Sequence, residues 1–172
     1  MNTSDLDLKK QKYIERMAYI KGKGTLHKLL RWGNLIFSGI VYVAYPLLLI
    51  VLLIQKNPIL ARAIIVPLDS FLILSVARYF INRKRPYELY ECEPAIYRDK
   101  KGNSFPSRHV FCVFVIATTF VGAGFPLAGI LLFLVGVCIA WIRVYCGVHF
   151  FSDVVVGAAI GTLCGVIGFW GI

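Results

Sequence analysis

Uncharged, apolar stretches long enough to cross a membrane recur along this chain. A helix of about 20 apolar residues spans the hydrocarbon core of a bilayer, and Leu35–Ile54 is such a run. Residues 59–81 and Val154–Ile172 form two more, although the former contains Arg62 and Asp69. A backbone inside hydrocarbon has to satisfy its own hydrogen bonds, so apolar runs of this length predict membrane-spanning helices.

A further apolar stretch, Val110–Ile142, carries no charge and is too long for one crossing. Its break is Gly122–Pro126, since glycine and proline interrupt regular helix. We therefore expect spans at 105–122 and 126–143, with a polar loop at 82–106 before them. The predicted fold class is all-α, a polytopic transmembrane helical bundle of about five spans.

The residues before the first span are polar and basic, with apolar side chains interleaved. The basic residues are Lys9, Lys10, Lys12, Arg16, Lys21, Lys23, Lys28 and Arg31. Basic amphipathic helices of this kind lie on membrane surfaces, so we expect one or two short interfacial helices, broken near Gly22 and Gly24. For residues 1–12, a solvated basic tail fits nearly as well. The chain is thus divided into a basic amphipathic N-terminal segment, 1–33, and a membrane-embedded domain, 34–172.

The composition excludes an ordinary soluble domain, because 58% of the residues are hydrophobic and only 16% are charged. We predict a multi-pass integral membrane protein. Its formal charge of +10 does not indicate nucleic-acid binding, since the basic residues lie before the first span and around the polar clusters. Membrane lipids with anionic head groups and a lipid phosphate substrate explain that distribution better. The five cysteines have irregular spacing and no C-x-x-C, which indicates neither a disulfide framework nor a zinc site.

Three short polar clusters interrupt the apolar sequence: Arg78–Pro86, Pro106–His109 and Arg143–Asp153. Charges beside hydrocarbon are costly and usually have a functional reason. Alternating spans place all three clusters on one membrane face. The second span ends at the first cluster, the third span begins at the second cluster, and the last two spans meet at the third. Helix ends on one face are able to converge on a single site.

Two histidines and a carboxylate in these clusters suit phosphoryl transfer. His149 and Asp153 are four residues apart and share a helix face. A carboxylate bonded to one ring nitrogen fixes the tautomer and frees the other nitrogen to attack. We predict His149 as the nucleophile, Asp153 as the residue that orients it, and His109 as the general acid. Taken alone, a His/Asp pair at this spacing is more often an ordinary contact on a helix surface. A lone histidine such as His109 is more often a structural residue at the start of a helix.

Arg78, Arg85 and Arg143 are suited to bind phosphoryl oxygens and stabilise the charge of a transition state. Ser107 stands at an expected helix start, where its hydroxyl binds an anion, caps the helix, or does both. For Asp69 two interpretations stay open, an ion pair within the bundle or a carboxyl that is protonated or bonded to a neighbouring helix. Four further cations of the region, Lys84, Arg98, Lys100 and Lys101, are assigned to the membrane interface.

The three clusters together resemble the three-part motif of the phosphatidic acid phosphatase type 2 superfamily. The motif reads K-x6-R-P, then P-S-G-H, then S-R-x5-H-x3-D. The residues that match it are Arg85, Pro86, Pro106, Ser107, His109, Arg143, His149 and Asp153. Three positions depart from it: Arg78 replaces lysine, Arg108 replaces glycine and Ile142 replaces serine. The resemblance covers residues 78–153.

The resemblance implies a membrane phosphatase that needs no metal ion or other cofactor. His149 would form a phosphohistidine supported by Asp153, and His109 would protonate the leaving group. Arg108 would add a contact to a phosphate or diphosphate, or point away and anchor at the membrane interface. The residues that would hold the phosphate are Arg78, Arg85, Ser107 and Arg143.

The resemblance also implies the reaction, hydrolysis of a lipid phosphomonoester or diphosphate such as phosphatidic acid, phosphatidylglycerol phosphate or a polyprenyl diphosphate. Two alternatives stay open, a lipid phosphotransferase using the same histidine and a non-catalytic membrane protein that retains the fold. We expect the protein in a bacterial cell membrane. The positive-inside rule applied to residues 9–31 places the catalytic face in the cytoplasm, whereas many bacterial relatives face outward, usually with six spans.

Overall fold

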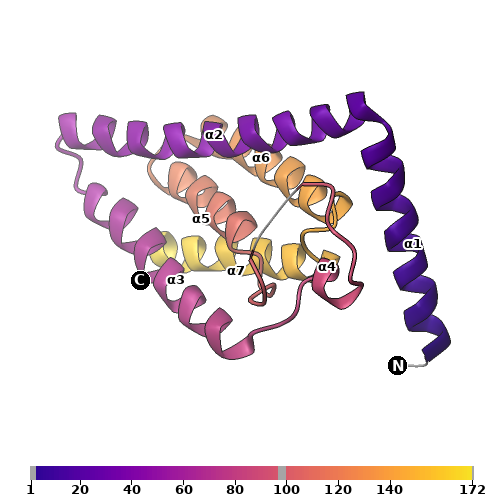
Figure 1. Cartoon of the computed structure of the whole chain (residues 1–172). Helices are drawn as coiled ribbons and strands as arrows, with labels where there is room; N and C mark the ends of the chain where they lie inside the picture. Colours follow the sequence, from indigo (N-terminus) through magenta and orange to yellow (C-terminus); the bar gives the residue numbers. More distant parts are fainter. Residues whose placement is uncertain (1–2, 97–99, 172) are drawn as a thin grey trace.

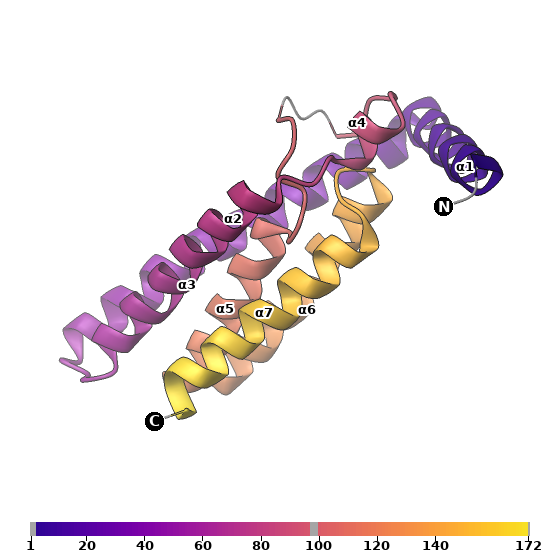
Figure 2. The ribbon, with the colours of Figure 1, turned by 90° about the horizontal axis from the view of Figure 1, so that it is seen from below.

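The computed structural model describes residues 3–96 and 100–171. Within these residues the chain is helical and has no strand, so the predicted all-α class is confirmed (Figure 1). The helices are α1 (Thr3–Gly22), α2 (Gly24–Ile54), α3 (Leu60–Ile81), α4 (Pro86–Leu89), α5 (Arg108–Gly122), α6 (Pro126–Tyr145) and α7 (Phe151–Trp170). The long helices α2, α3, α5, α6 and α7 gather into one bundle, and α1 and α4 lie at one end of it (Figure 2).

Four stretches of the described chain are long and apolar enough to cross a membrane: α2, the segment Leu60–Leu89, α6 and α7. The predicted helical membrane bundle is therefore confirmed. The remaining expected span is α5, which has only 15 residues. A helix of that length extends about 22 Å, less than the roughly 30 Å of a hydrocarbon core. It starts at Arg108 rather than at residue 105, because the backbone of Ser107 is extended.

The helix α2 begins well before the first predicted span. It starts at Gly24 and continues without a break to Ile54, so no helix end separates residues 33 and 34. Leu30, in its first third, is buried and belongs not to the central core but to a second apolar cluster, formed by residues of α1, α6 and two loops. The division of the chain into 1–33 and 34–172 stays a prediction.

The helix α1 turns away from the start of α2 and passes alongside α4 (Figures 1 and 2). Tyr13, Met17 and Ile20 are buried and lie on one face of α1, since they are three and four residues apart. They pack with residues of two loops, among them Ala95 and Val148. The apolar face expected at the membrane surface therefore contacts the protein itself.

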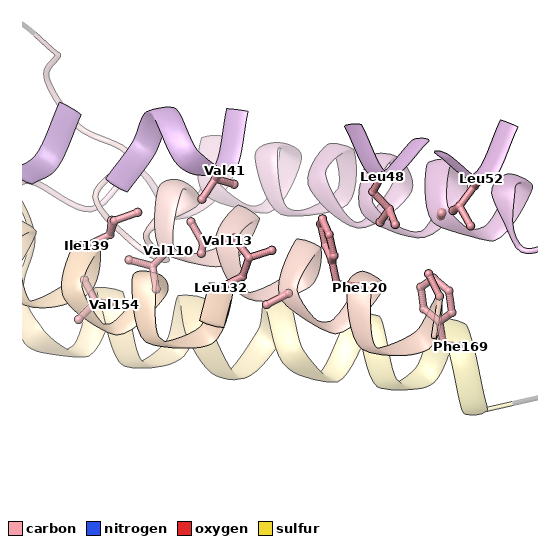
Figure 3. Close-up of a cluster of buried hydrophobic side chains, with 13 residues drawn as sticks. Val41, Leu48, Leu52, Val110, Val113, Phe120, Leu132, Ile139, Val154 and Phe169 are labelled. Atoms are coloured by element: carbon pink, nitrogen blue, oxygen red, sulfur yellow. The ribbon is translucent and has the colours of Figure 1, made fainter. Parts of the chain in front are cut away.

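The core of the bundle is apolar and centres on α5. Side chains from α2, α5, α6 and α7 meet in one cluster (Figure 3). The labelled members of this cluster are Val41, Leu48, Leu52, Val110, Val113, Phe120, Leu132, Ile139, Val154 and Phe169. Such packing positions the start of α5 beside the start of α7.

Glycines on α7 allow it to approach α5 very closely. A Cβ atom on Gly157 would lie 2.7 Å from the carbonyl oxygen of Ser107, and one on Gly161 would lie 2.5 Å from that of Phe111. Because the obstacles are backbone atoms, only a residue without a side chain fits. The close approach lets the backbone N–H of Ser107 donate to the carbonyl oxygen of Asp153 at 2.8 Å, which joins two of the predicted clusters.

We predict that Gly161→Ala destabilises the protein by about 1–3 kcal/mol, because the added methyl group overpacks the contact between α5 and α7. Gly39→Ala in α2 is the matched control, since a Cβ there meets nothing within 4 Å. Denaturation in detergent micelles measures both variants. Equal melting temperatures for the two variants would show that the close approach is not needed.

Candidate active site

His149 and Asp153 form the centre of the candidate site. His149 lies in the connection between α6 and α7, and Asp153 lies in the first turn of α7. Both are buried, and the Nδ1 atom of His149 is 3.4 Å from Oδ2 of Asp153. The same oxygen accepts the backbone N–H of Phe150 at 3.0 Å, so the carboxylate also caps the start of α7. With Nδ1 directed at the carboxylate, Nε2 is the ring nitrogen left to attack a substrate.

Two residues that the sequence interpretation did not single out complete this arrangement. Ser104 is fully buried; its hydroxyl donates to Asp153 Oδ2 and lies 3.3 Å from Nδ1 of His149. Arg83 forms an ion pair with Asp153, Nη1 to Oδ1, at 2.7 Å. Arg83 lies within the first polar cluster, Arg78–Pro86, and could have been identified from it. Nothing comparable in the sequence marks Ser104, a single serine in a polar loop.

The three predicted phosphate-binding arginines converge from different elements. Arg78 is in the last turn of α3, Arg85 precedes α4 and Arg143 is in the last turn of α6. Their exposed fractions are only 7%, 7% and 3%. Arg78 donates from Nη2 to the carbonyl oxygen of Asn103, and its buried Nη1 has no hydrogen-bond partner in the described part of the chain.

A small cavity of about 40 Å³ lies at the point where these residues meet, here called the catalytic cavity. Six of the eight predicted site residues line it. Lys100, which was expected at the membrane interface, lines it as well. The lining residues are Arg78, Arg85, Lys100, Arg108, His109, Arg143 and His149. The two histidines therefore border one small space surrounded by cations, as attack and leaving-group protonation on the same phosphorus require.

The other two predicted residues lie just outside the lining. Asp153 lies beside Nδ1 of His149. Ser107 is fully buried; its side chain makes no capping bond to α5, and its Oγ has no partner among the described residues. The interpretation of Ser107 as a plain helix cap is therefore not supported by the geometry.

Asp69 and Arg98 are two further residues that the sequence analysis considered. Asp69 is exposed on α3, and neither the expected ion pair nor a hydrogen bond to a neighbouring helix is found for it in the described part of the chain. Arg98 lies outside the described residues. In residues 3–96 and 100–171, no group of three or more His, Cys, Asp or Glu side chains is placed to hold a metal ion.

An apolar groove of about 380 Å³ leads to the catalytic cavity from the side of the bundle. It runs between α2, α3, α5 and α6, and its apolar lining includes Val41, Tyr45, Phe71, Cys112, Ile116 and Ile139. Arg108 and His109 line both the groove and the catalytic cavity. The groove therefore offers an apolar space that ends at the candidate general acid.

Burial sets the ionisation of His149. It lowers the pKa of His149 from 6.5 to about 4, and the charges of Arg85 and Arg143 act in the same direction against the opposing hydrogen bond with Asp153. The imidazole is therefore neutral at physiological pH, which is the form with a lone pair available for attack.

A family model and two solved structures match this architecture. The model of the PAP2 superfamily matches residues 58–172. The chain belongs to the PAP2 superfamily. The crystal structure of Aquifex aeolicus LpxE is 30% identical in sequence with a TM-score of 0.68, covering 91% of this chain and 93% of that one. No curated protein sequence matches the chain significantly.

A second similar structure supports the PAP2 fold alone. It is the crystal structure of the first transmembrane PAP2-type phosphatidylglycerolphosphate phosphatase from Bacillus subtilis. Its sequence identity is 22% and its TM-score is 0.61, over 96% of this chain and 92% of that one. The PAP2 family match begins in the turn before α3 and therefore leaves α1 and α2 outside it.

We predict that the imidazole of His149 is still neutral at pH 5.5, because its pKa is lowered by burial to about 4. The ring-nitrogen chemical shifts of 15N-histidine-labelled protein, followed from pH 8 to pH 4 in detergent, measure this directly. The signal that disappears in His149→Gln identifies the residue. A titration midpoint near 6.5 for that signal would contradict the prediction.

Proposed function

We propose that this protein is an integral-membrane lipid phosphatase that works through a phosphohistidine at His149. The observation that carries the proposal is the placement of His149 and His109 on one cavity that is lined by arginines and continuous with an apolar groove. The cavity suits a phosphoryl group and the groove suits a lipid tail. Membership of the PAP2 superfamily and similarity in fold to a transmembrane PAP2-type phosphatase support the same conclusion.

The first step is attack by Nε2 of His149 on phosphorus. The P–N bond forms, the bond between phosphorus and the lipid oxygen breaks, and protonated His109 gives its proton to that oxygen. Since His109 borders both spaces, the departing oxygen lies where the groove meets the cavity. The lipid alcohol then leaves through the groove.

The second step is hydrolysis of the phosphohistidine. Neutral His109 takes a proton from water, the oxygen attacks phosphorus and the P–N bond breaks, which releases orthophosphate and restores neutral His149. The role of Asp153 is to stabilise the positive charge that develops on the imidazole. Ser104 and Arg83 act as positioning residues, because each holds one oxygen of that carboxylate.

In this proposal, guanidinium groups supply the positive charge that stabilises the transition state. Arg78, Arg85 and Arg143 bind the phosphoryl oxygens in the roles expected from the motif, and preorganised donors of this kind stabilise developing negative charge. We propose that no metal ion is needed for that reason. The unpartnered Oγ of Ser107 is the further donor that we assign to the phosphoryl group.

The lipid is proposed to be a phosphorylated membrane lipid with a long apolar tail, as phosphatidic acid, phosphatidylglycerol phosphate and polyprenyl diphosphates all are. A bacterial cell membrane is the proposed location, in agreement with the bacterial sources of the two similar structures. An acceptor other than water would turn the same phosphohistidine into a phosphotransferase, and product analysis with labelled lipid distinguishes the two.

We predict that His149→Ala lowers phosphate release from phosphatidic acid by about a thousandfold or more, since the nucleophile itself is lost. The wild type treated with 32P-labelled lipid and quenched in alkali is expected to carry an acid-labile label that His149→Ala lacks. His27→Gln is the matched histidine control, because His27 hydrogen-bonds the carbonyl oxygen of Ala95 and does not line the catalytic cavity. Undiminished release by folded His149→Ala would refute the mechanism.

We predict that Ile116→Trp raises KM for long-chain phosphatidic acid on the order of tenfold, which corresponds to about 1.4 kcal/mol of lost tail contacts. The indole would fill part of the groove that Ile116 lines. The KM for a short-chain, water-soluble analogue should be unchanged. Leu163→Trp, at an exposed position of α7, controls for the added ring, and the same rise in that variant would show that the groove does not hold the tail.

A further inference from the structure

A second cationic cavity adjoins the catalytic cavity. It has a volume of about 350 Å³ and is lined by Ser75, Arg78, Arg85, Lys100, Lys101, Gly102, Asn103 and Arg108. Four of these residues, Arg78, Arg85, Lys100 and Arg108, also line the catalytic cavity. The two cavities therefore share one wall of positive charge.

The charge of this second cavity is not balanced by acidic side chains in its lining. Five of its eight lining residues are lysines or arginines and none is acidic. The nearby Glu88 is used structurally, since its Oε2 accepts the backbone N–H groups of Arg85 and Gly102, each at 2.8 Å. Cations that are crowded and partly desolvated in this way repel one another, and a bound anion relieves that repulsion.

One buried donor points to an anion more specifically. Arg78 has an exposed fraction of 7%, and its Nη1 has no hydrogen-bond partner among the described residues. Because Arg78 lines both cavities, a group bound between them would satisfy this donor. A buried donor without a partner otherwise costs about 1–3 kcal/mol.

The loop that carries the two lysines is anchored to the protein. Gly102 donates to Glu88 and accepts a hydrogen bond from Nε of Arg85 at 3.0 Å. The hydroxyl of Tyr87 donates to the carbonyl oxygen of Lys100. Lys100 and Lys101 are thus presented to the second cavity by a loop that hydrogen bonds hold at Lys100 and Gly102.

Arg108 stands at the junction of all three spaces, since it lines the groove, the catalytic cavity and the second cavity. Its guanidinium carbon lies 5.3 Å from the centre of the Phe71 ring, a cation–π contact that holds it there. The family motif has glycine at this position. An arginine here reaches whatever joins the lipid tail to the phosphoryl group under attack.

The volumes of the catalytic cavity and the second cavity suit different parts of a substrate with two phosphates. A cavity holds one water molecule for about every 10–15 Å³ of volume of this kind, so the catalytic cavity, at about 40 Å³, has room for about three water molecules or for a single phosphoryl group. Any other phosphate of the same substrate has to lie outside it. The adjoining cationic cavity, which is larger, is the neighbouring space with donors for it.

We propose that Arg108, Lys100 and Lys101 form a second anion subsite that binds a non-reacting phosphoryl group on the leaving-group side of the substrate. The preferred substrates are then lipids with two phosphoryl groups, the outer one attacked by His149 and the inner one held by Arg108. This inference rests on the proposed function; it narrows the candidate lipids to those with two phosphoryl groups and names the residues that select them. The bond that breaks joins the outer phosphorus to the inner phosphate in a diphosphate, or to the glycerol oxygen in phosphatidylglycerol phosphate, and in both cases His109 protonates the oxygen that leaves.

The test compares three lipids with identical acyl chains in mixed micelles of the full-length protein. Phosphatidic acid has one phosphoryl group, diacylglycerol pyrophosphate has two in direct linkage, and phosphatidylglycerol phosphate has two separated by a glycerol. We expect Arg108→Gln and Lys101→Gln to lower kcat/KM for at least one of the two-phosphate lipids about tenfold more than for phosphatidic acid. Whichever two-phosphate lipid is affected shows the spacing that the subsite accepts.

Lys84→Gln is the matched control, because Lys84 is an exposed cation of the same region that lines a different cavity. It should change kcat/KM for all three lipids by the same small factor. Equal losses for all three lipids in Arg108→Gln and Lys101→Gln would overturn the second subsite and leave the proposed function intact. Lys101 is exposed, so its replacement tests the subsite even if Arg108→Gln fails to fold.

Calorimetric titration with two phosphonates tests the subsite without turnover. We expect methylenediphosphonate to bind the wild type about tenfold more tightly than methylphosphonate, and Arg108→Gln to lose that difference. Absence of phosphate release from every lipid by the wild type would refute the proposed function, while the phosphonate preference still reports on the subsite. The same affinity for both phosphonates in the wild type would refute the subsite.

Discussion

The buried carboxylate of Asp153 is the interaction on which the rest of the site depends. Removing an ionised carboxylate from water costs several kcal/mol unless donors replace the water. Here the donors are the Ser104 hydroxyl, the Arg83 guanidinium and the Phe150 backbone N–H, and His149 lies beside them. These groups come from the loop after α3, the segment before α5 and the start of α7. Satisfying one charge therefore fixes the relative positions of three chain segments and the orientation of the nucleophile.

A second constraint is the crowding of arginines at the same end of an apolar bundle. Arg78, Arg85 and Arg143 are almost fully buried, and the carbonyl oxygens of residues 102 and 103 accept hydrogen bonds from two of them. These neutral acceptors solvate the guanidinium groups without neutralising them. The remaining positive charge makes the cavity complementary to phosphate, and ligands that bind only the folded state also stabilise it. The glycine contacts between α5 and α7 bring the starts of these two helices together at the same end of the bundle, with no side chains between them.

Much of the fold and of the candidate site could be predicted from sequence because the signals are local. The apolar runs predicted the membrane helices. The spacing of His149 and Asp153 correctly predicted that the two side chains pair, but not through a shared helix face, because His149 precedes the start of α7. Predictions that depended on distant contacts did less well. Lys100 was assigned to the membrane interface but lines the catalytic cavity. Ser104 was not identified at all, because nothing in its neighbourhood marks a serine that bonds a carboxylate 49 positions away.

The sequence by itself determined the class of the protein, the side of the bundle that carries the polar clusters, and the residues suited to attack, protonation and phosphate binding. Those properties follow from hydrophobic length, alternation of spans and side-chain chemistry, which are all local or additive along the chain. Only the tertiary structure decided that α5 is short and central, that α1 packs on the loops, and that Arg108 stands where three spaces meet. Each of these depends on which surfaces fit together once the helices pack, and no residue carries that information alone.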